Sequence, residues 1–200
     1  MRSFINGSGA YLTVDMSDVS RLIDNLRGIM KRDQFERLIY RTFGEVGRRS
    51  KTIISRAVRQ EYVAPDNWVK SQIERYQLTM GGAMPVTCKI PLKGTKGVIG
   101  KQFPASGGRR GRPLMASIVR GARSRLPAVM QNQGGQPPFM SGGVAFTRKS
   151  AARIPIVRVV GLAVPQMPLN RSEERTQRQI LELAEKRLEH NFYHILGSGR

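Results

Sequence analysis

The chain has 200 residues, 40% of them hydrophobic, which allows one folded domain and excludes wholesale disorder. Its 34 Lys and Arg against 14 Asp and Glu give a formal charge of +20 at pH 7. From Arg75 to Ser172 there are sixteen basic residues and no acidic one, so the middle of the chain holds most of this excess. Such a charge attracts a polyanion, most commonly nucleic acid, or an acidic protein partner.

A single cysteine, Cys88, excludes an intramolecular disulfide framework and fits a reducing compartment. It lies in the alternating segment VTCKIPL, which predicts a small buried side chain rather than a nucleophile. The first ten residues lack the apolar stretch of a secretory signal. No apolar run approaches the roughly 20 residues of a membrane span, so no membrane partner is expected.

The N-terminal part of the chain predicts one strand and two helices. Residues 10–16 alternate in polarity and predict an edge strand, and the three-four spacing of residues 17–29 predicts a short helix. A long helix is expected over residues 33–60. Gly44 and Gly47 lie within it, and because the apolar stripe keeps its phase through them, they indicate close packing against another segment rather than a bend.

The opposite face of this long helix is basic. A charged helix face is usually solvated, and direct contact with a polyanion is the alternative. The residues concerned are Arg37, Arg41, Arg48, Lys51, Arg56 and Arg59. A short helix is expected next, over residues 67–76.

The centre of the chain predicts short strands separated by glycine-rich segments. The strands are expected at residues 76–80, 86–92, 114–121, 143–149 and 153–160. Two long segments lie between them, a basic Gly-rich arm at 93–113 and a Pro/Gly-rich loop at 127–143. Both contain apolar anchors, such as Phe103 and Phe139, which a solvating linker does not need. We therefore interpret both as arms that order against neighbouring subunits or partners.

The final segment, residues 170–196, predicts an amphipathic helix capped by Asn170, with an apolar stripe that includes Ile180, Ala184 and Leu188. Together these elements predict an α+β fold in a single domain, residues 1–200. An antiparallel β-sheet packs with the long N-terminal helix and the C-terminal amphipathic helix, and extended loop arms leave this core.

The sequence offers little for catalysis. His190 and His194 are four residues apart on the last helix, a spacing that can hold a metal, but no further ligand accompanies them. The middle of the chain has no carboxylate for acid–base chemistry, and no phosphate-binding glycine loop stands between a strand and a helix. No catalytic residue, cofactor or metal is therefore expected, and an enzyme is not expected.

The segment GGRRGRP and the arginines after it are the candidate contacts with nucleic acid. A flexible basic arm can follow a phosphate backbone without reading sequence. The alternative is a basic loop facing solvent or an acidic subunit. Aromatic side chains are scarce here, which argues against a dedicated RNA or single-strand platform. The candidate residues are Arg109, Arg110, Arg112, Arg120, Arg123 and Arg125.

The stretch RIPIVRVVGLAVPQM, residues 153–167, contains no side chain that can transfer a proton at neutral pH. It predicts an apolar strand, a glycine break, a second apolar run and a proline stop before the last helix. It is either buried within one subunit or shared between two. A short apolar strand can add its edge to a neighbour's sheet. The candidate interface residues are Ile154, Ile156, Val164, Pro165 and Met167.

These segments, in this order, resemble the tail completion proteins of tailed bacteriophages, the minor tail protein Z family. The resemblance rests on RIPIVRVVGLAVPQM, on GGVAFTRK before it and on the closing helix NRSEERTQRQILELAEKRLEHNFYHIL. It covers residues 144–196 well and the rest of the chain loosely.

The resemblance implies a non-enzymatic virion protein of the tail or neck, assembled in the host cytoplasm. Such proteins are expected to form a homo-oligomeric ring, a hexamer, at the head-proximal end of the tail. Their implied partners are the tail terminator, the tail tube and the head–tail connector, with DNA passing through the channel without sequence specificity. The alternative is a non-specific nucleic-acid-binding or ribosome-associated basic protein.

Overall fold

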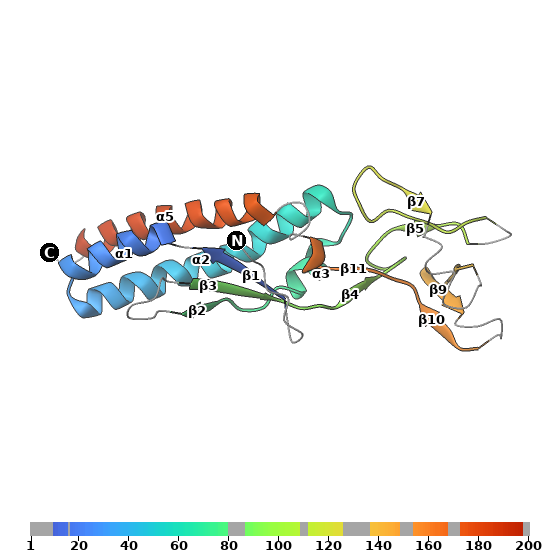
Figure 1. Cartoon of the computed structure of the whole chain (residues 1–200), viewed down its shortest axis with the longest axis horizontal. Helices are drawn as coiled ribbons and strands as arrows, with labels where there is room; N and C mark the ends of the chain where they lie inside the picture. The colour runs from blue at the N-terminus through green and yellow to red at the C-terminus, as the bar shows by residue number, and fades with distance from the viewer. Residues whose placement is uncertain are drawn as a thin grey trace. The chain divides into compact units, whose positions relative to one another are not determined.

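The structure is a computed structural model (Figure 1), and it describes residues 10–15, 17–79, 87–108, 112–125, 137–148, 154–167 and 173–197. Within these residues the fold is α+β, with a long N-terminal helix, a C-terminal helix and small antiparallel sheets, which confirms the predicted class. The predicted single domain instead separates into two compact units. The first comprises the described residues of 1–56, 73–93 and 172–200, and the second those of 57–72 and 94–171.

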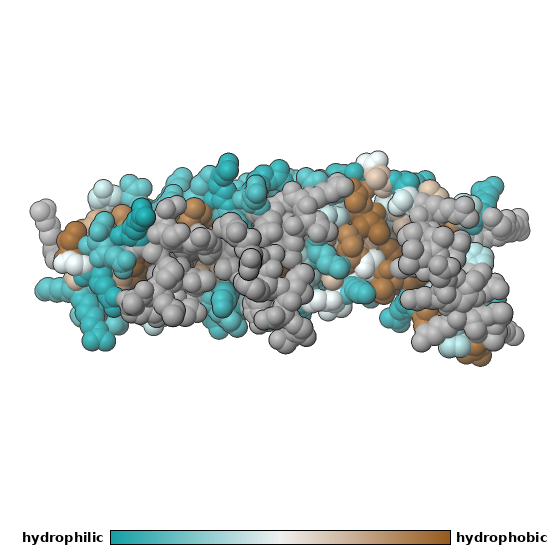
Figure 2. All heavy atoms as spheres, in the orientation of Figure 1, coloured by the Kyte–Doolittle hydropathy of each residue, from teal (hydrophilic) through white to brown (hydrophobic). Residues whose placement is uncertain are grey.

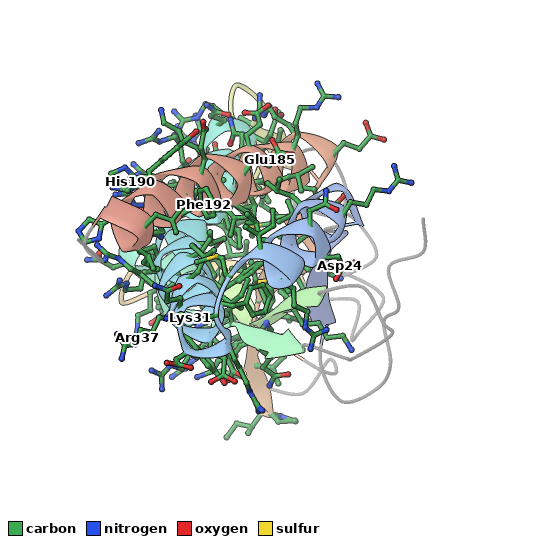
Figure 3. The ribbon with its side chains drawn as sticks, turned by 90° about the vertical axis from the view of Figure 1, so that its left-hand side faces the viewer. Asp24, Lys31, Arg37, Glu185, His190 and Phe192 are labelled. Atoms are coloured by element: carbon green, nitrogen blue, oxygen red, sulfur yellow. The ribbon has the colours of Figure 1, made fainter. Side chains whose placement is uncertain are left out.

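The first unit contains three helices and one sheet (Figures 1 and 3). The helices, which lie side by side, are α1 (Ser17–Ile29), the part of α2 (Arg32–Glu61) up to Arg56, and α5 (Glu173–Gly197). The strands are β1 (Ala10–Asp15), β2 (Gln77–Thr79) and β3 (Thr87–Leu92), paired antiparallel in the order β1-β3-β2. As predicted, β1 is an edge strand.

The core of this unit follows from the apolar periodicity of α2 and α5. The fully buried side chains are Leu38, Ile39, Phe43, Val46 and Ile54 on α2, Ile180, Ala184 and Leu188 on α5, and Leu12 and Cys88 on the sheet. Ser50 interrupts the stripe of α2, yet it is also fully buried. Its Oγ donates to the Val46 carbonyl oxygen at 2.7 Å, so the hydroxyl is satisfied within the helix. The helix therefore continues unbroken, as predicted.

The second unit contains the end of α2, one short helix and eight short strands in three small sheets. The helix is α3 (Asp66–Ser71). The sheets are β11 (Val160–Ala163) with β4 (Lys96–Val98); β5 (Ala105–Ser106), β6 (Met115–Ala116) and β7 (Ser124–Arg125); and β10 (Ile156–Arg158), β9 (Val144–Arg148) and β8 (Phe139–Ser141). All strand pairs are antiparallel.

Phe103 is the centre of this second core, with an exposure of 0%. Two glycines on paired strands allow its ring to approach: a Cβ at Gly97 would lie 2.6 Å from Phe103 Cε2, and one at Gly161 would lie 2.9 Å from it. Trp68 meets the ring edge-on, with centroids 5.9 Å apart. The segment 93–113 is therefore not an arm that needs a neighbouring subunit for its anchors, because they are buried in the chain's own core.

The segment 153–160 forms two strands rather than the single strand predicted. Val159 separates them: its N–H donates to the Ala145 carbonyl at 2.8 Å, and its carbonyl accepts from Ile99 N–H at 3.0 Å. The backbone thus changes partner from β9 to β4 at this residue. The break predicted at Gly161 is wrong, because that glycine accommodates Phe103 instead.

Two further elements are shorter than the sequence predicts. The expected strand 114–121 is reduced to β6, because Ile118 accepts from Val63 N–H and Arg120 N–H donates to Glu61 at the end of α2. The expected helix 67–76 ends at Ser71, since Ile73 already forms an antiparallel bridge with Leu92. Among the helices that the structure describes, none combines the length and apolarity that crossing a bilayer requires.

Candidate nucleic-acid interface

The predicted arginine cluster is only partly described. Arg109 and Arg110 lie outside the described residues, as do the cap Asn170 and most of the loop 127–143, of which β8 is described. Arg125 lies on β7, but its side chain is not described. Arg112, Arg120 and Arg123 are exposed on the second unit, so three of the six predicted cations are on the surface.

Arg120 has a structural partner that the sequence reasoning missed. Its guanidinium donates to the Arg59 carbonyl from Nε at 3.1 Å and from Nη2 at 2.9 Å. Its backbone N–H donates to the Glu61 carbonyl at 2.7 Å. These are carbonyls of the last turn of α2, which have no partner inside the helix. Arg120 therefore caps α2. Arg123 also has a partner within the chain, because its guanidinium donates to Ser106 Oγ.

The apolar stretch 153–167 divides into an exposed half and a buried half. Ile154, just before β10, is 73% exposed, and Ile156, the first residue of β10, is 45% exposed; β10 is an edge strand of its sheet. Val164, Pro165 and Met167 are buried in the chain's own second core, which contradicts their prediction as surface contacts and favours the core alternative. In Figure 2, apolar side chains gather over β4 and β11 and over the end of β10 that lies farther from β11.

A basic groove lies in the first unit, between α2 and the segment that precedes β2. Its cations are Arg41, Arg48 and Lys51 on α2, and Arg75. Spacings of seven and three residues place the three helical cations on one face. The hollow has a volume of about 640 Å³, and its lining, as far as the structure describes it, contains no carboxylate. We call the hollow lined by these four cations and by Tyr40, Gly44, Gly47 and Tyr76 the basic groove.

Two glycines and two tyrosines complete the basic groove: Gly44, Gly47, Tyr40 and Tyr76. The Tyr76 ring lies on the helix at Gly47, where a Cβ would be 1.8 Å from Tyr76 Cδ1. This confirms close packing at Gly47, where a side chain approaches, but not at Gly44, whose Cβ would have only the Tyr76 hydroxyl nearby, at 3.7 Å. Tyr40 is 65% exposed at the other end of the groove.

The cations of the groove have few anionic partners. Within the part of the chain that the structure describes, Arg48, Lys51 and Arg75 form no ion pair. Arg41 pairs with Glu45 at 3.7 Å, but Glu45 is shared with Arg187 at 3.4 Å. The groove thus has a net positive charge with low-dielectric walls, an arrangement that concentrates anions.

The remaining chemically capable side chains are separate from one another. Burial raises the pKa of the Cys88 thiol to about 11, which agrees with the prediction of a buried, unreactive side chain. His190 and His194 are exposed, and the Arg41 guanidinium donates to His194 Nδ1 at 3.4 Å. Figure 3 shows His190 and Arg37 on the outside of the helices and Phe192 between the helices. Within the described residues, no three His, Cys, Asp or Glu side chains gather as metal ligands.

The sequence alone predicts the cations that α2 contributes to the groove, but not the rest of its lining. The basic face of α2 was identified from its periodicity, but Arg75 and Tyr76 were not joined to it, because they lie more than twenty residues further along the chain. The pair of glycines on the same face was the available signal. A comparison with protein-family models, with curated proteins and with solved structures found no match for this chain.

Proposed function

We propose that this protein is a non-enzymatic structural component of a tailed bacteriophage virion. In this role it is a tail completion or neck protein that forms a ring at the head-proximal end of the tail, and it supports head–tail joining and DNA passage. The succession of sequence motifs in residues 144–196 supports the family, and the charge of +20 supports a position beside DNA.

The observation that carries this proposal is the exposed edge of β10. Among the described residues β10 is paired with β9 alone, and Ile156 on the strand and Ile154 just before it are exposed, while the continuation of the same motif is core. An open edge with exposed apolar side chains can accept or add a strand from another chain. In a ring this contact is heterologous, because each β10 meets a different surface of the next subunit.

The basic groove favours the second candidate, a non-specific nucleic-acid-binding or ribosome-associated protein. The two functions differ in what the isolated subunit does. A nucleic-acid-binding protein binds tightly as a monomer, whereas a ring protein gains affinity when its subunits, and with them their charges, assemble.

The test is electron microscopy of the purified protein, alone and mixed with phage tails, with native mass spectrometry of the same sample. We expect closed rings of one stoichiometry, six subunits, and a collar at the head-proximal end of the tails. The variant Ile156→Asp should keep the fold but lose the rings, and the exposed control Ile29→Asp should keep both; Ile29 is 77% exposed on α1. A monomer that binds nucleic acid tightly and no tail would overturn the proposal in favour of the second candidate.

A further inference from the structure

We infer that the basic groove binds the phosphodiester backbone of nucleic acid, with the strand running along α2. The groove combines four cations and two tyrosines with two glycines, and none of the described residues that line it is a carboxylate. Phosphate oxygens are the acceptors that Arg and Lys side chains bind most readily in nucleic acids. The inference differs from the arginine arm considered above, because the groove belongs to the first unit and to regular structure.

The spacing of the cations matches a polyanion better than a single small anion. Arg41 and Lys51 are ten residues apart on α2, which is about 15 Å at ~1.5 Å per residue. Phosphates of one strand recur every ~3.4 Å along the axis of a duplex, so a row of this length faces more than one of them. Arg75 faces the same hollow from outside the helix. A strand seated there is held from both sides.

The cations are available to such a ligand. Arg48 and Arg75 are exposed, and neither forms an ion pair within the described ranges. Neighbouring carboxylates are already bound, since Glu74 pairs with Lys93 at 3.8 Å and Glu45 with Arg187 at 3.4 Å. Like charges held together without partners repel, and a row of phosphates relieves this repulsion while counterions are released.

The glycines and tyrosines make room for the strand and contact it. At Gly44 the nearest atom to a Cβ would be the Tyr76 hydroxyl at 3.7 Å, so the tyrosine extends along the floor rather than across it. An exposed tyrosine such as Tyr40 can stack on bases or donate to phosphate without selecting a sequence. The described residues of the lining include no Asn, Gln, Asp or Glu, the side chains that pair with adenine or cytosine edges. Binding is therefore expected to have little sequence preference.

One end of the groove is defined by charge. The adjoining hollow shares Tyr40 and Arg41 and is also lined by Arg37, Asp33 and Glu36, so beyond Arg41 the cations are interspersed with carboxylates. An acidic protein surface is the competing ligand for the groove. The length of the row and the flanking tyrosines favour nucleic acid over isolated carboxylates, because the phosphates of a strand follow one another without interruption.

The inference deepens the proposed function and rests on it only for the source of the nucleic acid, which would be the DNA of the tail channel. The contact itself can be measured on the purified full-length chain. The probes are a 20-base single strand and a 20-base-pair duplex of mixed sequence, both labelled, with fluorescence anisotropy from 50 to 200 mM salt.

The key variant is Arg48→Gln with Arg75→Gln. Its control, Arg178→Gln with Lys186→Gln, removes the same charge from exposed positions on α5. With four phosphate contacts, duplex affinity should fall about 150-fold over this salt range, from a slope of about −0.9 per contact. The groove variant should fall only about 12-fold and bind at least ~10-fold more weakly at 50 mM salt, whereas the control should keep the wild-type slope.

The charge-preserving variant Arg48→Lys with Arg75→Lys should restore most of the affinity, because phosphate binding needs the charge rather than the guanidinium fork. Equal losses in the groove variant and the control would overturn the inference, since binding would then follow net charge alone. Tighter binding of a 20-residue poly-glutamate than of either nucleic acid, lost in the groove variant, would overturn it in favour of an acidic protein. Preference for the single strand or for the duplex identifies which source of phosphate fits the groove.

The two proposals can fail separately. Rings that form normally from a protein whose groove variant binds DNA like wild type would reject the groove and keep the tail function. Groove-dependent binding by a protein that forms no ring and joins no tail would keep the groove and reject the tail function.

Discussion

The ring of Tyr76 rests directly on Gly47 of α2, so that a Cβ at this glycine would lie 1.8 Å from Cδ1 and 2.3 Å from Cε1 of the tyrosine. Gly44, one turn earlier, has only the Tyr76 hydroxyl within reach, at 3.7 Å. Each glycine weakens the helix by about 1 kcal/mol relative to alanine. Only Gly47 has a packing reason to be there, because the Tyr76 ring covers the helix at that position.

Gly47→Ala should therefore destabilise the protein by about 1–3 kcal/mol, since the overpacking exceeds the gain in helix propensity. Gly44→Ala, the matched control, should be neutral or stabilising by up to about 1 kcal/mol. Urea unfolding followed by circular dichroism measures both. Adding Tyr76→Ala should remove most of the penalty of Gly47→Ala, and independent effects of the two changes would contradict the contact.

A second prediction concerns the buried hydrogen bond from Asn191 Nδ2 to Thr42 Oγ1, 3.2 Å long, which joins α5 to α2. Both side chains are fully buried. Thr42→Val should cost about 1–3 kcal/mol of unfolding free energy, because it leaves a buried amide without its acceptor. Thr42→Val combined with Asn191→Leu should recover much of the loss, which equilibrium unfolding of the two variants can measure. A double variant less stable than the single one would contradict this account.

The helices could be predicted from the sequence because their determinants are local. The apolar stripe of α2 keeps its phase through Gly44 and Gly47, so the helix was expected to run through them, and it does. The partner of Gly47 could not be predicted, since Tyr76 reaches it through the tertiary fold. The same applies to Arg120, whose bond to Arg59 joins residues 61 positions apart.

The β-rich part was predicted less well because its strands are only two to five residues long. Such strands are selected by pairing and burial, which periodicity does not report. Gly161 was interpreted as a break because glycine commonly marks one, but here the reason is the ring of Phe103. The exposed Ile154 and the buried Val164 have similar apolar character in the sequence, and only the fold distinguishes them.

Substitutions at the glycines around Phe103 give a third prediction. Gly97→Ala places a Cβ 2.6 Å from Phe103 Cε2 and 3.0 Å from Trp68, so it should cost about 1–3 kcal/mol. Trp68 is the single tryptophan of the chain, so its fluorescence reports unfolding of the second unit. Gly94→Ala, with nothing within 4 Å, is the control and should leave the tryptophan transition unchanged. Equal transitions for both variants would show that the ring does not need the glycine.

A fourth prediction follows from the pKa of Cys88, which burial raises from 9.0 to about 11. Below pH 9 the thiol is protonated in both states, and between pH 9 and 11 only the unfolded chain loses the proton. Stability should therefore fall as the pH rises through this window. Between pH 7 and pH 10 the wild type should lose roughly 1 kcal/mol more than Cys88→Ala, which lacks the thiol. Urea unfolding of both proteins at the two pH values tests this, and parallel losses would contradict it.

The last prediction separates the two halves of the apolar stretch 153–167. Val164 is fully buried, so Val164→Asp would place a charge among apolar side chains and should unfold the second unit, visible in Trp68 fluorescence. Ile156, 45% exposed on β10, has water on one side, so Ile156→Asp should keep the wild-type tryptophan transition within about 0.5 kcal/mol. If β10 forms the subunit contact, Ile156→Asp should nevertheless abolish oligomers in sedimentation velocity at every concentration where the wild type assembles. Rings formed by folded Ile156→Asp would exclude this edge as the contact, because a carboxylate cannot be buried there without a partner.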